Sequence, residues 1–265
     1  MIGGSLIEGA LRQSRIVIVC AISGVVVLAW AYLLLGAGMS MHEMGEMPMA
    51  REPALWTPAY FAVVMTMWAV MMAAMMLPSA APMILLYDKI ARHRVPDGDY
   101  ALVVGLFGLG YVLVWGAFSL MAVVLQFGLD QATLLSPMMS TTSTWLAGAV
   151  LIAAGLYQWT PLKQTCLRRC RSPLEFLITE WRDGGKGALL IGFRHGAYCL
   201  GCCWALMLLL FVGGIMNLVW IAAIAVFIAV EKLAPAGHWI GKGAGVVMAT
   251  WGAITIGWTM ISLSA

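Results

Sequence analysis

The sequence predicts an all-α protein, a polytopic bundle of transmembrane helices with about seven spans. Hydrophobic residues make up 62% of its 265 residues, and charged residues only 10%. A soluble domain carries about 25% charged residues, and no soluble fold of this length hides so much apolar surface. Apolar windows of about 20 residues recur along the chain, each long enough to cross a bilayer. Because the loops between them are short, we expect one membrane domain that covers residues 1–265.

Seven apolar windows mark the predicted spans. They cover about residues 16–38, 58–86, 100–126, 142–160, 187–212, 214–231 and 243–263. The first window is too long for the apolar part of a cleavable signal peptide, so we expect it to remain as a span. Gly213 and Gly214 predict a tight turn that joins the fifth and sixth spans into a hairpin. Pro78 and Pro82 predict a kinked or loosened helix near the end of the second span.

The positions of the basic residues predict the orientation of the bundle. In the seven-span arrangement, all of the 15 lysines and arginines except Arg51 fall on one side of the membrane. Cytoplasmic loops are enriched in Lys and Arg, so we expect the N-terminus inside and the C-terminus outside. The largest polar segment, residues 161–186, is expected to contain a short interfacial helix. That helix should begin at Ser172 and Pro173 and stop at Gly184.

The predicted outer loop, residues 38–53, is rich in methionine. Thioethers bind soft ions such as Cu(I). Unlike thiols, they need no deprotonation and survive in an oxidising compartment. The alternative is an amphipathic loop that lies on the membrane surface, but the density of Met beside a His favours metal binding. The predicted ligands in this loop are Met39, Met41, His42, Met44, Met47 and Met49.

Methionines continue into the second predicted span as two stripes at helical spacing. Met commonly fills irregular gaps between membrane helices, so packing is the ordinary interpretation. Because the outer loop leads directly into this helix, a track of thioethers into the membrane is the competing one. The stripes are Met67, Met71 and Met75, and Met65, Met72 and Met76.

The fifth predicted span places an imidazole and three thiols on one helical face. Ionisable groups within membrane spans are rare and usually functional. The group predicts a two- or three-coordinate site for a soft metal. Two alternatives remain: thiol–disulfide chemistry at the C-x-x-C pair Cys199 and Cys202, or packing. The residues of this face are His195, Cys199, Cys202 and Cys203, followed by Met207.

Two further cysteines and a glutamate lie at the predicted cytoplasmic side. Cys166 and Cys170 form a C-x3-C pair with flanking arginines, which we expect to lower the pKa of the thiols. The pair would exchange a metal ion, become acylated or stay inert. Glu231 is expected to anchor the end of the sixth span or to pair with Arg194 across the hairpin.

Three motifs together resemble a known family. They are "MWAVMMAAMMLPSAAPM" (67–83), "GFRHGAYCLGCCWALM" (192–207) and "AVEKLAP" (229–235). They resemble a bacterial family of predicted metal-binding integral membrane proteins, described as a domain of unknown function. The resemblance implies a multi-pass protein of the bacterial inner (plasma) membrane that associates with a metal, and it implies no particular reaction.

The leading functional interpretation is Cu(I) handling in the inner membrane, by transport or by delivery to an extracytoplasmic metalloprotein partner. Another soft transition metal would suit the same ligands. Under this interpretation the protein is not an enzyme. The alternatives are a membrane thiol–disulfide oxidoreductase that uses Cys199 and Cys202, and a non-catalytic scaffold subunit. The expected partners are the lipid bilayer and this metalloprotein, and the sequence has no basic array suited to nucleic acid.

Overall fold

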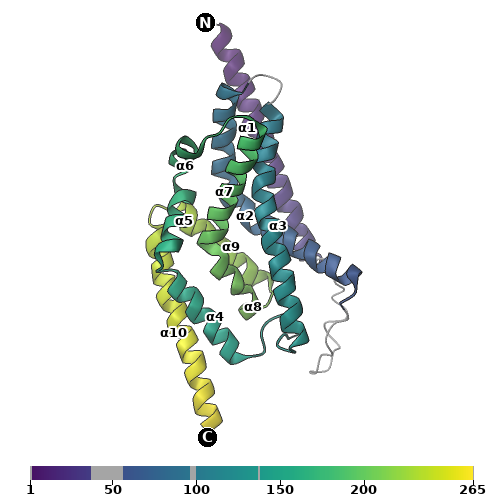
Figure 1. Ribbon diagram of the computed structural model, residues 1–265, viewed down its shortest axis with the longest axis vertical. Coiled ribbons are helices and arrows are strands. Elements are labelled where there is room, and N and C mark those ends of the chain that lie inside the picture. The colour runs from purple at the N-terminus through teal and green to yellow at the C-terminus, as the bar shows by residue number, and fades with distance from the viewer. Residues whose placement is uncertain (1, 37–55, 96–99, 137, 265) are drawn as a thin grey trace.

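The computed structural model describes residues 2–36, 56–95, 100–136 and 138–264 (Figure 1). It is 86% helix, and the described residues form no β-strand, so the predicted all-α class is confirmed. The helices are α1 (Ile2–Leu34), α2 (Pro58–Arg94), α3 (Tyr100–Gln131), α4 (Thr144–Tyr157), α5 (Pro161–Arg171), α6 (Pro173–Glu180), α7 (Gly184–Leu208), α8 (Leu210–Gly213), α9 (Leu218–Leu233) and α10 (Gly237–Ser264).

Five helical segments within the described residues are long and apolar enough to cross a membrane. They are Ile16–Leu34, Pro58–Arg94, Tyr100–Gln131, Gly184–Gly213 and Gly237–Ser262. The fourth and sixth predicted windows correspond to α4 and α9, which have only 14 and 16 residues. A straight crossing needs about 20 residues. Five helical segments are thus candidates for full-length spans by length and composition, and the seven-span count and the orientation stay predictions.

The second predicted span is longer than expected. The side chain of Thr57 caps α2 by accepting a hydrogen bond from the Tyr60 amide, and Pro58 occupies the first helical position. The helix then continues without a break through Pro78 and Pro82 and ends at Arg94, well past residue 86. The helix therefore does not break at the prolines, and the predicted kink stays a prediction. The first part of the helix buries its methionines in one core cluster, and the later part buries Met83 and Tyr87 in a second cluster.

The polar segment between α4 and α7 differs from its prediction. It forms two helices rather than one. The first begins at Pro161, where the Thr160 side chain accepts a hydrogen bond from the Lys163 amide, and this cap was not predicted. The second helix, α6, begins at Pro173 as predicted but ends at Glu180. The predicted stop, Gly184, instead begins α7 with a φ of +76°. A left-handed residue suits a sharp change of direction, and here it starts a helix rather than ending one.

The predicted hairpin turn is present between α8 and α9. Gly214 has a φ of +95°, a conformation that favours glycine. Asn217 then caps α9 by accepting a hydrogen bond from the Trp220 amide. As Figure 1 shows, α9 lies in the middle of the molecule, while α4 and α10 lie side by side and lead towards the C-terminus.

Close approach of two backbones brings α3 and α7 together. A Cβ added at Gly110 would overlap the Leu189 carbonyl oxygen, and one added at Gly192 would overlap the Phe107 carbonyl oxygen. Small residues of this kind allow membrane helices to approach closely. The contact fixes α7, and with it the thiols that α7 carries, against α3.

Gly110→Ala is expected to destabilise the protein by about 1–3 kcal/mol, because the new methyl group meets backbone atoms that cannot move aside. The free energy of unfolding in detergent micelles is the measurement. Gly108→Ala on the same helix is the matched control, since its added Cβ would meet no atom within 4 Å. Equal stability of the two variants would contradict this account of the α3–α7 contact.

Candidate metal site

The predicted face of α7 lies at the centre of the molecule. His195, Cys199, Cys202, Cys203 and Met207 are all buried, with exposed fractions of 3% or less. The thiols of Cys202 and Cys203 donate to the Cys199 carbonyl oxygen at 3.1 and 3.0 Å. The face is therefore turned into the bundle, which is where a polar group in a membrane helix is expected.

Cys199 is the residue of this group with the most polar surroundings. Its Sγ lies 3.0 Å from the Lys232 ammonium at the end of α9. The Tyr111 hydroxyl of α3 lies 3.3 Å from the same sulfur and also donates to the Met76 carbonyl oxygen at 3.3 Å. Side chains of α3 and α9 thus meet at a sulfur atom of α7, and the Tyr111 hydroxyl links this point to α2. Neither Lys232 nor Tyr111 was predicted from the sequence as a site residue.

A thioether completes the sulfur group on the side of α2. Cys203 Sγ lies 3.9 Å from the Met76 Sδ. Met67, Met71, Met72 and Met75 are also buried and belong to the same core cluster as the thiols, while Met65 is half-buried. The two predicted stripes therefore form core packing, and one of their members also contacts a thiol. Met39, Met41, His42, Met44, Met47 and Met49 lie outside the described residues.

The two cysteines of α5 lie on its side towards α7, where Cys166 is buried and Cys170 is half-buried. Hydrogen bonds to the Cys199 and Cys202 side chains, followed by burial, raise the pKa of the Cys170 thiol. Burial and the neighbouring Cys202 raise the pKa of Cys166, whose Sγ would lie 2.8 Å from a Cβ added at Gly201. The prediction that flanking arginines lower these pKa values is therefore wrong. The arginines lie on the other faces of α5, and the thiols face other thiols.

The raised pKa of Cys170 gives it a distinctive pH dependence of alkylation. Only the thiolate reacts, so a raised pKa leaves less reactive form at a given pH and moves the rise in rate above the ordinary value of about 8.5. The rate of reaction with iodoacetamide, followed by mass spectrometry from pH 7 to 11, measures this. Thr165→Cys supplies a reference thiol at an exposed position on the same helix. A midpoint at or below that of the reference would contradict the assignment.

His195 is buried without a polar partner. Neither ring nitrogen has a hydrogen bond to the described residues. The ring lies against Tyr111, Phe107 and Phe176, with centroid separations of 5.6, 6.3 and 5.8 Å. A buried imidazole normally has at least one hydrogen bond. An imidazole with two available nitrogens, one helical turn before Cys199, could serve as an additional metal ligand.

No ready-made cage of three donors is present. Among the residues that the structure describes, no group of three or more His, Cys, Asp or Glu is arranged to hold a metal ion. All six cysteines are free thiols, so Cys199 and Cys202 are not joined by a disulfide. The arrangement therefore suits an ion that accepts few ligands, such as Cu(I) held by two sulfurs, better than an ion that requires four.

Comparison with known proteins supports the same metal. A protein-family model described as PpoB2, copper chaperone, matches residues 65–255. The chain belongs to the PpoB2 copper chaperone family. Membership of the PpoB2 family supports the predicted association with copper and a copper-handling or copper-enzyme partner. The matched range includes the methionines of α2, the thiols of α5 and α7, and Lys232, and it begins after the predicted outer loop. No curated protein and no solved structure matches the chain.

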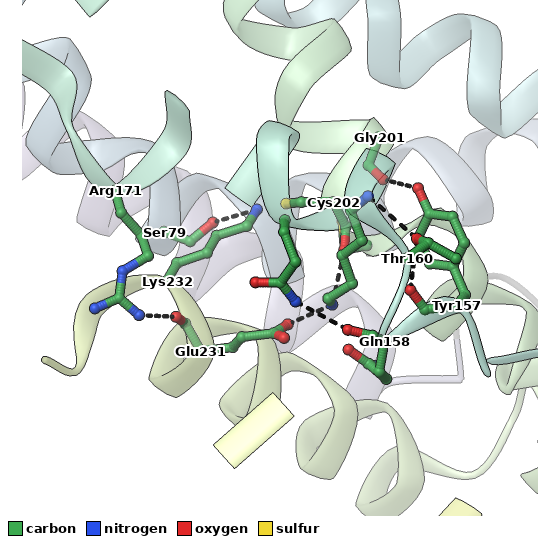
Figure 2. Close-up of polar contacts among 12 residues, drawn as sticks. Ser79, Tyr157, Gln158, Thr160, Arg171, Gly201, Cys202, Glu231 and Lys232 are labelled. Atoms are coloured by element: carbon green, nitrogen blue, oxygen red, sulfur yellow. Dashed lines mark hydrogen bonds and ion pairs between the residues drawn. The ribbon is translucent and has the colours of Figure 1, made fainter. Parts of the chain in front are cut away.

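A buried ion pair supports the thiol region of this PpoB2 family member from the side of α5. Lys163 donates to the Glu231 carboxylate at 2.7 Å and to the Cys202 carbonyl oxygen at 2.9 Å. Arg171 donates to the carbonyl oxygens of Glu231 and Pro235 at 3.0 and 2.6 Å. Figure 2 shows Arg171 on one side of Glu231 and Gln158 on the other. These contacts fasten the end of α9 to α5.

The predicted partner of Glu231 is wrong. Arg194 forms its ion pair with Glu180 of α6, not with Glu231. Arg194 lies where α7 passes α6, whereas the Glu231 carboxylate is engaged by Lys163. The sequence offered no signal for Lys163, because a lysine in a polar segment is ordinarily exposed. Here it is fully buried.

Proposed function

We propose that this protein is a membrane-embedded copper chaperone that holds Cu(I) between Cys199 and Cys202. The observation that supports this most strongly is the convergence of thiols from α5 and α7 on one buried point, beside a thioether and an ammonium group. Thiolate and thioether sulfur are the ligands that favour Cu(I) over harder ions. Membership of a copper chaperone family agrees with this chemistry.

Release of the ion would proceed by exchange of ligands. A chaperone must hold copper firmly and still pass it on, so a site of few ligands with further donors nearby is suitable. Cys170 is the next donor on the side of α5, and Cys203, Met76 and His195 are the next donors within the bundle. Each exchange replaces one sulfur ligand by another and changes no oxidation state.

The outer loop would form a second, exposed site for the same ion. In this proposal the protein lies in the bacterial inner membrane with seven spans, the N-terminus inside and the C-terminus outside. Met39, Met41, His42, Met44, Met47 and Met49 then face the compartment in which an extracytoplasmic copper enzyme would receive the ion. The oxidoreductase and scaffold interpretations are not favoured, because neither explains the family membership.

The test is anaerobic Cu(I) loading of the purified protein, with and without residues 39–49. We expect the deletion to lower the copper content but to leave about one tightly held ion, whose X-ray absorption spectrum shows sulfur neighbours at the short distances of low coordination. Absence of a tightly held ion from both proteins would contradict the internal site. An unchanged copper content after the deletion would contradict the role of the loop alone.

A further inference from the structure

We propose that Lys232 sets the charge of the internal site and thereby makes it selective for a singly charged soft cation. This inference rests on the proposed function, because it concerns the ion held at Cys199. It adds a residue that selects the charge of the ion, where the sulfur ligands select its softness.

Lys232 is an internal charge that points at the site. Its side chain is buried, with 6% of the residue exposed. The ammonium nitrogen lies 3.0 Å from Cys199 Sγ and 3.5 Å from Ser79 Oγ. Figure 2 shows the side chain extending towards Ser79 and away from the carboxylate of its neighbour Glu231. A buried ammonium is costly unless it is paired, and the sulfur is its closest partner.

The adjacent carboxylate is already neutralised by another residue. Glu231 Oε2 lies 2.7 Å from Lys163 Nζ, and both side chains are fully buried or nearly so. Arg171 approaches the same helix end but donates to carbonyl oxygens. Lys163 and Glu231 therefore cancel, and the positive charge of Lys232 is directed to the sulfur group of α7.

A fixed positive charge beside the ligand discriminates by the charge of the bound ion. Two thiolates, one Cu(I) and one ammonium sum to zero, a suitable balance for a buried site. A divalent ion on the same ligands leaves one uncompensated positive charge. The repulsion between the ammonium and the ion also doubles, and such repulsion is strong where water is excluded. Lys232 therefore disfavours Zn(II) more than Cu(I), while its hydrogen bond still supports the sulfur ligand.

The experiment compares metal preference in full-length variants purified without oxygen. Cu(I) affinity is measured by competition with bicinchoninate, and Zn(II) affinity by competition with a chromophoric chelator. Lys232→Met removes the charge and the donor, Lys232→Gln keeps a donor without the charge, and Lys232→Arg keeps the charge. Lys242→Met is the matched control, because Lys242 lies over the Trp159 and Trp239 rings and not beside a thiol.

We expect Lys232→Met and Lys232→Gln to lower the preference for Cu(I) over Zn(II) by about tenfold or more, which is 1.4 kcal/mol. Lys232→Arg and Lys242→Met should keep it, and Ag(I), which carries the same charge as Cu(I), should follow Cu(I) throughout. If the wild type binds Cu(I) and the neutral variants keep its preference within threefold, the inference is wrong while the proposed function stands. If the wild type binds no Cu(I), both fall. Should Lys232→Met fail to fold, Lys232→Gln decides.

Discussion

Cys199→Ser combined with Cys202→Ser is expected to lower the Cu(I) affinity of the purified protein by about 100-fold or more, because a hydroxyl is a poor ligand for a soft ion. The two thiols are buried on α7 within the group that also includes Cys170 and Cys203. Losing both removes the sulfurs that the proposal assigns to the ion. Competition with bicinchoninate under anaerobic conditions is the measurement.

The control for this variant is Cys20→Ser. Cys20 is an exposed free thiol on α1, so its loss should leave the affinity unchanged. The single variants are informative as well, because the neighbouring Cys203, Cys170 and His195 can replace one missing ligand but not two. We therefore expect each single substitution to weaken binding by a smaller factor than the pair. A double variant with wild-type affinity would rule out the internal site.

Lys163→Met is expected to destabilise the protein by about 3–5 kcal/mol, because it leaves Glu231 buried without its counter-charge. The variant also lacks the hydrogen bond that Lys163 donates to the Cys202 carbonyl oxygen. Unfolding in detergent micelles measures the change. Adding Glu231→Gln to the same chain should restore most of the stability, since a buried pair is often replaceable by neutral groups when both charges are removed.

A more exposed ion pair supplies the comparison. Arg194 of α7 pairs with Glu180 of α6, and their side chains are 39% and 18% exposed. Arg194→Met should cost less than about 1 kcal/mol, because solvent screens such a pair and leaves little net stabilisation. A Lys163→Met variant no less stable than Arg194→Met would show that the buried pair contributes nothing to the fold.

The helical class and the inward face of α7 were predictable because both follow from local periodicity. Apolar windows define helices, and the spacing of His195, Cys199 and Cys203 fixes a shared side. The lengths of α4 and α9 were not predicted. An apolar window gives no exact helix start, and the starts are set by the capping residues Ser143 and Asn217. The extension of α2 to Arg94 was also not predicted, because its last turns lie beyond the apolar window.

The site itself was only half predictable. Sequence spacing brings together residues of one helix, but Cys170, Tyr111 and Lys232 belong to three other helices. Their meeting depends on close contacts such as Gly110 against α7, which no single window shows. The sign of the pKa change at Cys170 was missed for the same reason. A flanking arginine is visible in the sequence, and a facing thiol is not.

The last turn of α9 has a consequence for regulation. Glu231 joins it to Lys163 and Arg171 of α5, and Lys232 joins it to Cys199 of α7. A protein that binds α5 and shifts it would displace the same turn that contacts Cys199, the proposed ligand. Thermodynamic linkage then requires reciprocity: a partner that weakens copper binding by some factor is itself bound more weakly, by the same factor, when copper is present. Release of the copper ion and binding of such a partner would thus be thermodynamically coupled.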